Sequence, residues 1–285
     1  MPTLSHDDIN QHYEIHGSGE PLLLHHGLSS NCRDWYRHLP WLTEMQQMVL
    51  IDARGHGMSS APAGDEHYSW EIMADDVNCL LEHLGIERAV IGGLSMGGGV
   101  SLAFALRYPE KVRALILCDC AGTGVRPAQM RASSEEMARQ MAARAEAVRQ
   151  HGVMEVLGYR AIAAGTAPGP VLEDEVQREV WLERLSHFSV NGAIHAWRAV
   201  IVTKVEGLDR VKELTMPVLV VIGEEDGLLP AAEWLRDELP NRRYVLLTKV
   251  GHATARYKPE GWRAAVEGFL GDLAAGRDIR GEVTL

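Results

Sequence analysis

The chain has 285 residues, of which 46% are hydrophobic and 24% are charged, and this content is sufficient for a large buried core. The 28 Lys and Arg residues are outnumbered by 39 Asp and Glu residues, which gives a net charge of −11. Because nucleic-acid binding depends on clustered cations, this balance argues against a nucleic-acid partner. No apolar run is long enough to span a membrane, and no secretory signal is visible, so we expect a cytoplasmic protein.

Short apolar runs recur along the chain and predict β-strands. They are continuously apolar rather than alternating, which is typical of parallel strands that helices cover on both faces. The segment around residues 12–15 predicts one further, antiparallel strand at the start. The runs lie at residues 21–25, 47–51, 89–92, 114–118, 218–222 and 244–247. Together they predict an α/β fold with a mostly parallel sheet.

Helical segments separate these runs. Ser69 is suited to cap a helix over residues 70–84, because its hydroxyl can accept a hydrogen bond from an amide of the first turn. Further helices are predicted over residues 96–107 and 259–273. Beyond Gly276 we expect a tail without regular structure.

The alternation of strands and helices stops over residues 123–214. Residues 133–150 are rich in Ala, Glu and Arg, and residues 171–204 carry apolar side chains at helical spacing. We interpret this stretch as a helical cap, or lid, domain. Residues 1–122 and 215–285 would then form the core domain.

The run Gly93-Leu94-Ser95-Met96-Gly97 has the pattern G-x-S-x-G and lies between a predicted strand and a predicted helix. A serine exposed on so sharp a turn brings the flanking backbones close together, so the positions two before and two after it must be small. Ser95 is therefore a candidate nucleophile. The amide of Met96, at the helix N-terminus, is a candidate oxyanion donor. The alternative is a glycine-rich packing turn without chemistry.

A serine nucleophile needs a base and an acid that orients the base. Among the 13 histidines, His252 lies in a loop directly after the last predicted strand and is the candidate base. Asp226, directly after the strand at 218–222, is the candidate acid, although it could also be a turn residue. Asp119, at the end of the strand at 114–118, is the alternative acid because it could also reach His252.

The loop after the strand at 21–25 can supply a second oxyanion donor, the amide of Leu28. His26, just before it, is interpreted as a residue that braces the loop. Asp52 and Arg54 belong to a glycine-rich segment that follows the next strand. We interpret that segment as a structural turn held by internal hydrogen bonds.

These motifs, in this order, resemble those of the α/β-hydrolase fold superfamily, and the resemblance extends over nearly the whole chain. It implies a mostly parallel sheet flanked by helices, with a helical cap inserted after the sixth strand. It also implies a catalytic triad of Ser95, Asp226 and His252, and an oxyanion hole formed by Leu28 and Met96. The motifs are H-G-L at residues 26–28, D-x-R-G-x-G-x-S at 52–59, G-x-S-x-G-G at 93–98, G-x-x-D-x-x-x-P at 223–230 and G-H at 251–252.

Within that superfamily, the run at 93–98 is similar to the 3-oxoadipate enol-lactonases and to small carboxylesterases. A serine rather than an aspartate at position 95 implies acyl chemistry. We therefore expect a hydrolase that cleaves a small-molecule ester or lactone, with no metal and no cofactor, as a monomer or a homodimer. One alternative is a carbon–carbon bond hydrolase that acts on a vinylogous diketone with the same triad. The other is a non-catalytic ligand-binding member of the superfamily.

Aromatic and histidine side chains of the predicted cap are candidates to line the substrate pocket. Most side chains of this kind pack between helices, so we expect only two or three to contact substrate. The candidates are Trp181, His187, His195 and Trp197. The sequence does not identify an arginine that could bind a carboxylate of the substrate.

Overall fold

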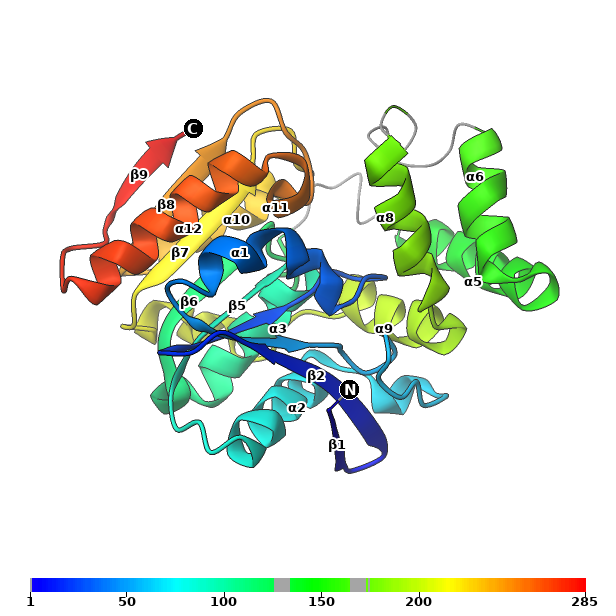
Figure 1. Ribbon diagram of the computed structural model, residues 1–285, viewed down its shortest axis with the longest axis horizontal. Helices are drawn as coiled ribbons and strands as arrows, with labels where there is room; N and C mark the ends of the chain where they lie inside the picture. Colours follow the sequence, from blue (N-terminus) through cyan, green and yellow to red (C-terminus); the bar gives the residue numbers. More distant parts are fainter. Residues whose placement is uncertain (1, 126–133, 165–172, 174) are drawn as a thin grey trace.

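The computed structural model describes residues 2–125, 134–164, 173 and 175–285, and these contain a single nine-stranded sheet (Figure 1). Its strands are β1 (Thr3–His6), β2 (Ile9–His16), β3 (Pro21–His25), β4 (Gln47–Ile51), β5 (Ala89–Leu94), β6 (Val112–Cys118), β7 (Val218–Gly223), β8 (Arg242–Leu247) and β9 (Gly281–Thr284). The spatial order is β1-β2-β4-β3-β5-β6-β7-β8-β9. The β1–β2 and β2–β4 pairs are antiparallel and the others are parallel, so the predicted α/β class is confirmed.

Helices cover both faces of the sheet. One face packs against α2 (Trp70–His83), α3 (Met96–Arg107) and α10 (Leu229–Glu238), and the other against η1 (Cys32–His38), α1 (Leu39–Leu42) and α12 (Pro259–Ala274). Large buried rings anchor each layer: Trp70 and Phe104 on the first face, and Trp35 and Trp262, whose ring centroids lie 5.5 Å apart, on the second. The short helices η3 (Pro109–Lys111), η5 (Leu208–Glu213) and α11 (Thr254–Tyr257) complete the core. None of the described helices is both long and apolar enough to cross a membrane.

A helical insertion follows the sixth strand, as predicted. Its described elements are α5 (Ser134–His151), a π-helical turn at Met154–Tyr159, α6 (Arg160–Ala163), α8 (Glu175–Ser186) and α9 (Val190–Val202). Figure 1 shows α5, α6 and α8 grouped beside the sheet at the right of the view. Helix α9 contacts η2 (Asp65–His67) of the core. Parts of the predicted cap, residues 126–133, 165–172 and 174, lie outside the described residues, and its limits stay a prediction.

The C-terminal tail forms a strand, so the prediction of a tail without regular structure was wrong. Strand β9 adds to the edge of the sheet in parallel with β8. The last residue, Leu285, donates its amide to the carbonyl of Leu246 at 2.9 Å and accepts from the amide of Thr248 at 2.8 Å. The hydrogen bonds join main-chain groups of the tail to those of β8, which is distant in the sequence. The composition of the tail therefore does not reveal the strand.

The glycine-rich segment after β4 is a structural turn, as predicted. The carboxylate of Asp52 accepts hydrogen bonds from the amides of Cys32 at 2.7 Å and Met58 at 2.9 Å. The guanidinium of Arg54 donates two hydrogen bonds of 2.7 Å to the carboxylate of Asp76 on α2. These contacts fix the loops that surround the carboxyl ends of the central strands.

Candidate active site

Ser95 lies on the sharp turn between β5 and α3 with φ of +56°, a region that non-glycine residues rarely occupy. The turn forms because its neighbours are glycines. A Cβ on Gly93 would lie 2.4 Å from the carbonyl carbon of Gly97, and a Cβ on Gly97 would lie 2.2 Å from the carbonyl oxygen of His25. Only glycine at these two positions allows the close approach of the backbones that the turn at Ser95 needs. Ser95 lies at the carboxyl end of β5, beside the loops that follow the neighbouring strands.

The structure brings Ser95, His252 and Asp226 together although they lie far apart in the sequence. Nε2 of His252 lies 2.9 Å from Oγ of Ser95, and Nδ1 lies 2.8 Å from Oδ2 of Asp226. A carboxylate can only accept, so Nδ1 carries the proton and Nε2 is free to accept from the serine hydroxyl. The other oxygen of Asp226 accepts from the amide of Leu228 at 2.9 Å, which holds the carboxylate in place. This arrangement can activate a nucleophile.

The electrostatics of the site favour a basic imidazole. Burial alone would lower the pKa of His252, but the hydrogen bond to Asp226 and the negative charges of Asp226 and Asp119 outweigh it and raise that pKa. The second carboxyl, Asp119, is fully buried at the end of β6. Burial, together with the like charge of Asp226, raises the pKa of Asp119 to about 7.

Asp119, the alternative acid, contacts a different partner. Its Oδ2 accepts hydrogen bonds from the amide of Thr254 at 2.8 Å and from the hydroxyl at 2.9 Å. The imidazole of His252 is paired with Asp226 instead. The geometry therefore favours Asp226 over Asp119 as the partner of the base.

The two predicted oxyanion donors are the amide of Met96, directly after Ser95, and the amide of Leu28 in the loop after β3. Met96 is the first residue of α3, where amides have no partner inside the helix and the helix dipole is positive. Leu28 follows β3 and lines the same cavity as Ser95. No backbone acceptor among the described residues takes a hydrogen bond from either amide. Both are therefore available to a developing negative charge.

A cavity of about 500 Å³ opens over Ser95 and His252. Its wall is mainly apolar and includes side chains of the helical insertion, among them Trp197 and Val200 of α9. Of the four predicted pocket residues, only Trp197 is among the residues that line this cavity. The other three, Trp181, His187 and His195, are not.

His195 instead joins the helical insertion to the core. Its Nδ1 lies 2.7 Å from the carboxylate of Asp65, and its Nε2 accepts from the amide of Gly64 at 3.2 Å. Its ring also stacks on Tyr68, with centroids 5.8 Å apart. We predicted that His195 lines the substrate pocket, but these contacts place it between the insertion and the core.

His187 and Phe188 line a smaller hollow, whose wall shares Ser29, Ser30 and Arg184 with the cavity.

Sequence reasoning missed two arginines in the cavity wall, Arg184 of α8 and Arg256 of α11. Both lie near Asp34 of η1: Arg256 donates to its carboxylate at 2.6 Å, and a nitrogen of Arg184 lies 3.9 Å from it. The chain has many arginines, and nothing in the sequence distinguishes these two. Only the packing of the insertion on the core brings them together.

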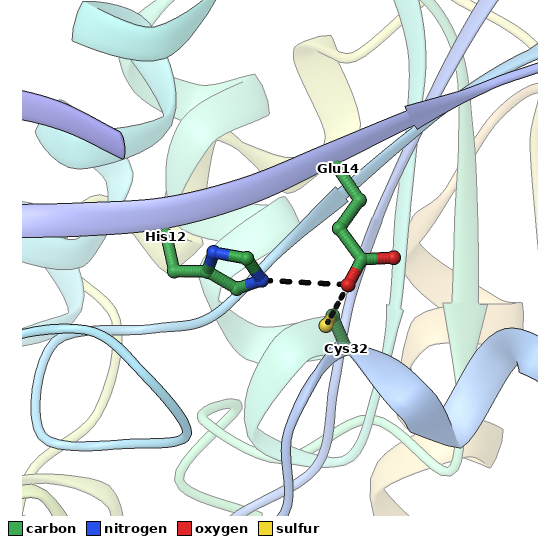
Figure 2. A group of neighbouring side chains, drawn as sticks. All are labelled: His12, Glu14 and Cys32. Carbon is green, nitrogen blue, oxygen red and sulfur yellow. Dashed lines mark hydrogen bonds and ion pairs between the residues drawn. The ribbon is translucent and has the colours of Figure 1, made fainter. Parts of the chain in front are cut away.

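One group of described residues, His12, Glu14 and Cys32, places three potential metal-ligand atoms within 4.8 Å of one another (Figure 2). The atoms already interact without a metal: Nε2 of His12 lies 3.4 Å from Oε1 of Glu14, and the thiol of Cys32 lies 3.7 Å from it. Burial and the neighbouring carboxylates of Asp52 and Glu14 raise the pKa of the Cys32 thiol far above its ordinary value. We interpret the group as a brace between β2 and the start of η1.

Comparison with known proteins relates the chain to hydrolases. Residues 20–257 match the family described as alpha/beta hydrolase fold. The 3-oxoadipate enol-lactonase 2 of Acinetobacter baylyi is 26% identical over 274 residues, which cover 94% of this chain and 96% of that protein. The 2-hydroxymuconate semialdehyde hydrolase of a Pseudomonas species is 37% identical over 109 residues, or 37% of this chain and 38% of that protein.

A solved structure shares most of the architecture. A thermophilic esterase from Thermogutta terrifontis has a TM-score of 0.76 and 27% sequence identity, and the match covers 93% of this chain and 94% of that one. The likeness therefore includes the helical insertion as well as the sheet.

Proposed function

The chain belongs to the α/β-hydrolase fold family, and we propose that it is a serine hydrolase that cleaves a carboxylic ester or lactone. The observation that carries the proposal is the pair of contacts from Ser95 to His252 at 2.9 Å and from His252 to Asp226 at 2.8 Å. These contacts lie in the wall of a cavity large enough for a small-molecule substrate.

In the proposed reaction, Oγ of Ser95 attacks the carbonyl carbon while Nε2 of His252 takes its proton. The carbonyl oxygen becomes an oxyanion and accepts hydrogen bonds from the amides of Leu28 and Met96, each worth roughly 10²–10³ in rate. The imidazolium, stabilised by Asp226, then gives its proton to the leaving alkoxide, and an acyl-enzyme remains. Water, deprotonated by His252, attacks the acyl carbon, and the carboxylic acid and the free serine are released.

Two further features support an acyl substrate of modest size. The relatives that match along most of the chain include an enol-lactonase and an esterase, which act on carbonyl–oxygen bonds. The cavity is closed on one side by α8 and α9 of the insertion, whose Arg184, Trp197 and Val200 line it. We propose that residues 123–214 form the cap that limits substrate size.

The test is hydrolysis of 4-nitrophenyl esters of rising acyl length, with simple and enol lactones, by the wild-type chain and by Ser95→Ala. We expect Ser95→Ala to lower kcat by roughly 10³-fold or more, because the nucleophile is lost while the fold is retained. A phosphonate directed at serine should label the wild type once and leave Ser95→Ala unlabelled. Ser186→Ala removes an exposed hydroxyl of α8 that bonds only locally to Glu183, and should behave as the wild type.

The outcomes separate the alternatives. Turnover that disappears in Ser95→Ala supports the ester or lactone hydrolase, and the best substrate indicates the pocket size. Phosphonate labelling without turnover of any ester or lactone contradicts it and favours carbon–carbon bond cleavage of a vinylogous diketone. If the phosphonate does not label the chain and no ester or lactone is hydrolysed, a catalytic role for Ser95 is contradicted and the ligand-binding alternative remains.

A further inference from the structure

A cluster of three charged side chains, Arg184, Arg256 and Asp34, lies at the cavity that contains Ser95. Arg184 and Arg256 line the cavity together with Ser95 and His252. Asp34 lies behind them, with only 3% of its side chain exposed. The three come from different parts of the fold: α8 of the insertion, α11 directly after His252, and η1.

The charges in this cluster do not balance. Two guanidinium groups face one carboxylate, that of Asp34, while the other carboxylate that lines the cavity, Asp226, is hydrogen-bonded to His252. Burial alone would raise the pKa of Asp34, but the charges of Arg256 and Arg184 outweigh it and lower that pKa to about 2, so Asp34 is ionised at neutral pH. Burial and the like charge of Arg256 lower the pKa of Arg184 to about 10, so it too is charged. The surplus cation is notable in a chain of net charge −11.

The hydrogen bonding is also incomplete. Arg256 is bonded to Asp34 at 2.6 Å, but the nearest contact between Arg184 and Asp34 is 3.9 Å, which is too long for a hydrogen bond. Nε of Arg184 is buried and has no hydrogen-bond partner among the residues that the structure describes. A buried cation whose hydrogen bonds are incomplete is costly, and an anion in the cavity that Arg184 lines would reduce that cost.

We propose that Arg184 and Arg256 bind a carboxylate group of the substrate, so that the preferred ester or lactone carries a second, free carboxylate. The inference rests on the proposed function, since it names the substrate class of that same site. A carboxylate matches the planar guanidinium fork in shape, and its single negative charge equals the surplus of the cluster. Ser95 and the two arginines share the cavity, so one molecule of suitable length contacts both.

The experiment compares matched pairs of substrates. Each pair consists of the mono-4-nitrophenyl ester of succinic, glutaric or adipic acid and the corresponding ester in which a neutral carboxamide replaces the free carboxylate. Because a free carboxylate can attack its own ester, the rate with Ser95→Ala is subtracted from every measurement. We expect the wild type to prefer the acid over the amide in kcat/KM by roughly 10- to 100-fold at the best length. Arg184→Gln should reduce that preference toward one, mainly through KM.

Two further variants test whether Arg184 binds the carboxylate of the substrate or only links the insertion to the core. Arg198→Gln breaks an ion pair that joins α9 to Asp65 at 2.6 Å, away from the cavity, and should keep the wild-type preference. Asp34→Asn removes the carboxylate that competes with the substrate for the two arginines, so it should increase the preference. If Arg184 only ties the insertion to the core, Asp34→Asn should not increase it.

Different results would overturn the carboxylate site and the serine hydrolase. If the wild type hydrolyses acid and amide equally well, the carboxylate site is wrong and the serine hydrolase stands. The same conclusion follows if Arg184→Gln slows both substrates by the same factor. If no ester in either set is hydrolysed and the phosphonate labels nothing, the proposed function itself is wrong.

Discussion

Asp119 holds Thr254 by two hydrogen bonds, from the amide at 2.8 Å and from the hydroxyl at 2.9 Å. Thr254 lies two residues after His252, so this contact fixes the loop that presents the imidazole to Ser95. The imidazole itself pairs with Asp226. We therefore assign the two buried carboxyl groups different tasks: Asp119 positions the loop, and Asp226 orients the base.

Asparagine substitutions should separate these two tasks. Asp226→Asn replaces an obligate acceptor by a group that can also donate, which destabilises the imidazolium, and we expect kcat to fall by roughly 10²–10⁴-fold. Asp119→Asn keeps an oxygen that can accept from Thr254, so we expect a loss of roughly tenfold or less. Steady-state kinetics on one 4-nitrophenyl ester measures both. If Asp119→Asn is the more harmful change, the assignment of the acid is wrong.

The pH dependence should report the charge around His252. The base must be neutral to accept the proton of Ser95, so activity falls as the pH drops through its pKa. Since Asp226 and Asp119 raise that pKa, the acidic limb of kcat/KM should lie above pH 6.5, the ordinary value for histidine. Removing the charge of Asp226 lowers the pKa of His252 and should shift the limb to lower pH. A profile of Asp226→Asn whose acidic limb coincides with that of the wild type would contradict this account.

Much of the fold was predictable because the determining signals are local. Continuous apolar runs identify strands buried on both faces, and the glycines at 93 and 97 identify the turn at Ser95 by a steric requirement. His252 and Asp226 were found because both directly follow strands, and parallel strands deliver their carboxyl ends to one edge of the sheet. These inferences need only the order of elements along the chain.

What could not be predicted depends on contacts between distant segments. Strand β9 exists because main-chain groups at the C-terminus pair with the exposed edge of β8. Arg184 reaches the cavity because α8 of the insertion lies beside η1, where its guanidinium is 3.9 Å from Asp34. His195 contacts Asp65 rather than the cavity because α9 packs on η2. Helical spacing shows which face of a helix is apolar, but not which surface it meets.

The buried pair of Arg54 and Asp76 should contribute strongly to stability. Both residues are 2% exposed, and two hydrogen bonds of 2.7 Å join them. Arg54→Met leaves the carboxylate buried without its cation, so we expect the free energy of unfolding to fall by about 3–5 kcal/mol in urea titrations. Arg107→Met is the control, because that arginine forms an exposed pair with Asp75 and should cost less than about 1 kcal/mol. Equal losses would contradict the role of burial.

The turn at Ser95 should not tolerate a methyl group at Gly97. In Gly97→Ala the new Cβ would lie 2.2 Å from the carbonyl oxygen of His25, so either the turn or β3 must move. We expect a loss of about 1–3 kcal/mol in stability and, because Ser95 is displaced, a large loss of ester turnover. Gly271→Ala in α12 meets nothing within 4 Å and should instead raise stability by about 1 kcal/mol, since alanine favours helix. Urea unfolding and ester hydrolysis measure both variants, and unimpaired turnover in Gly97→Ala would contradict the steric argument.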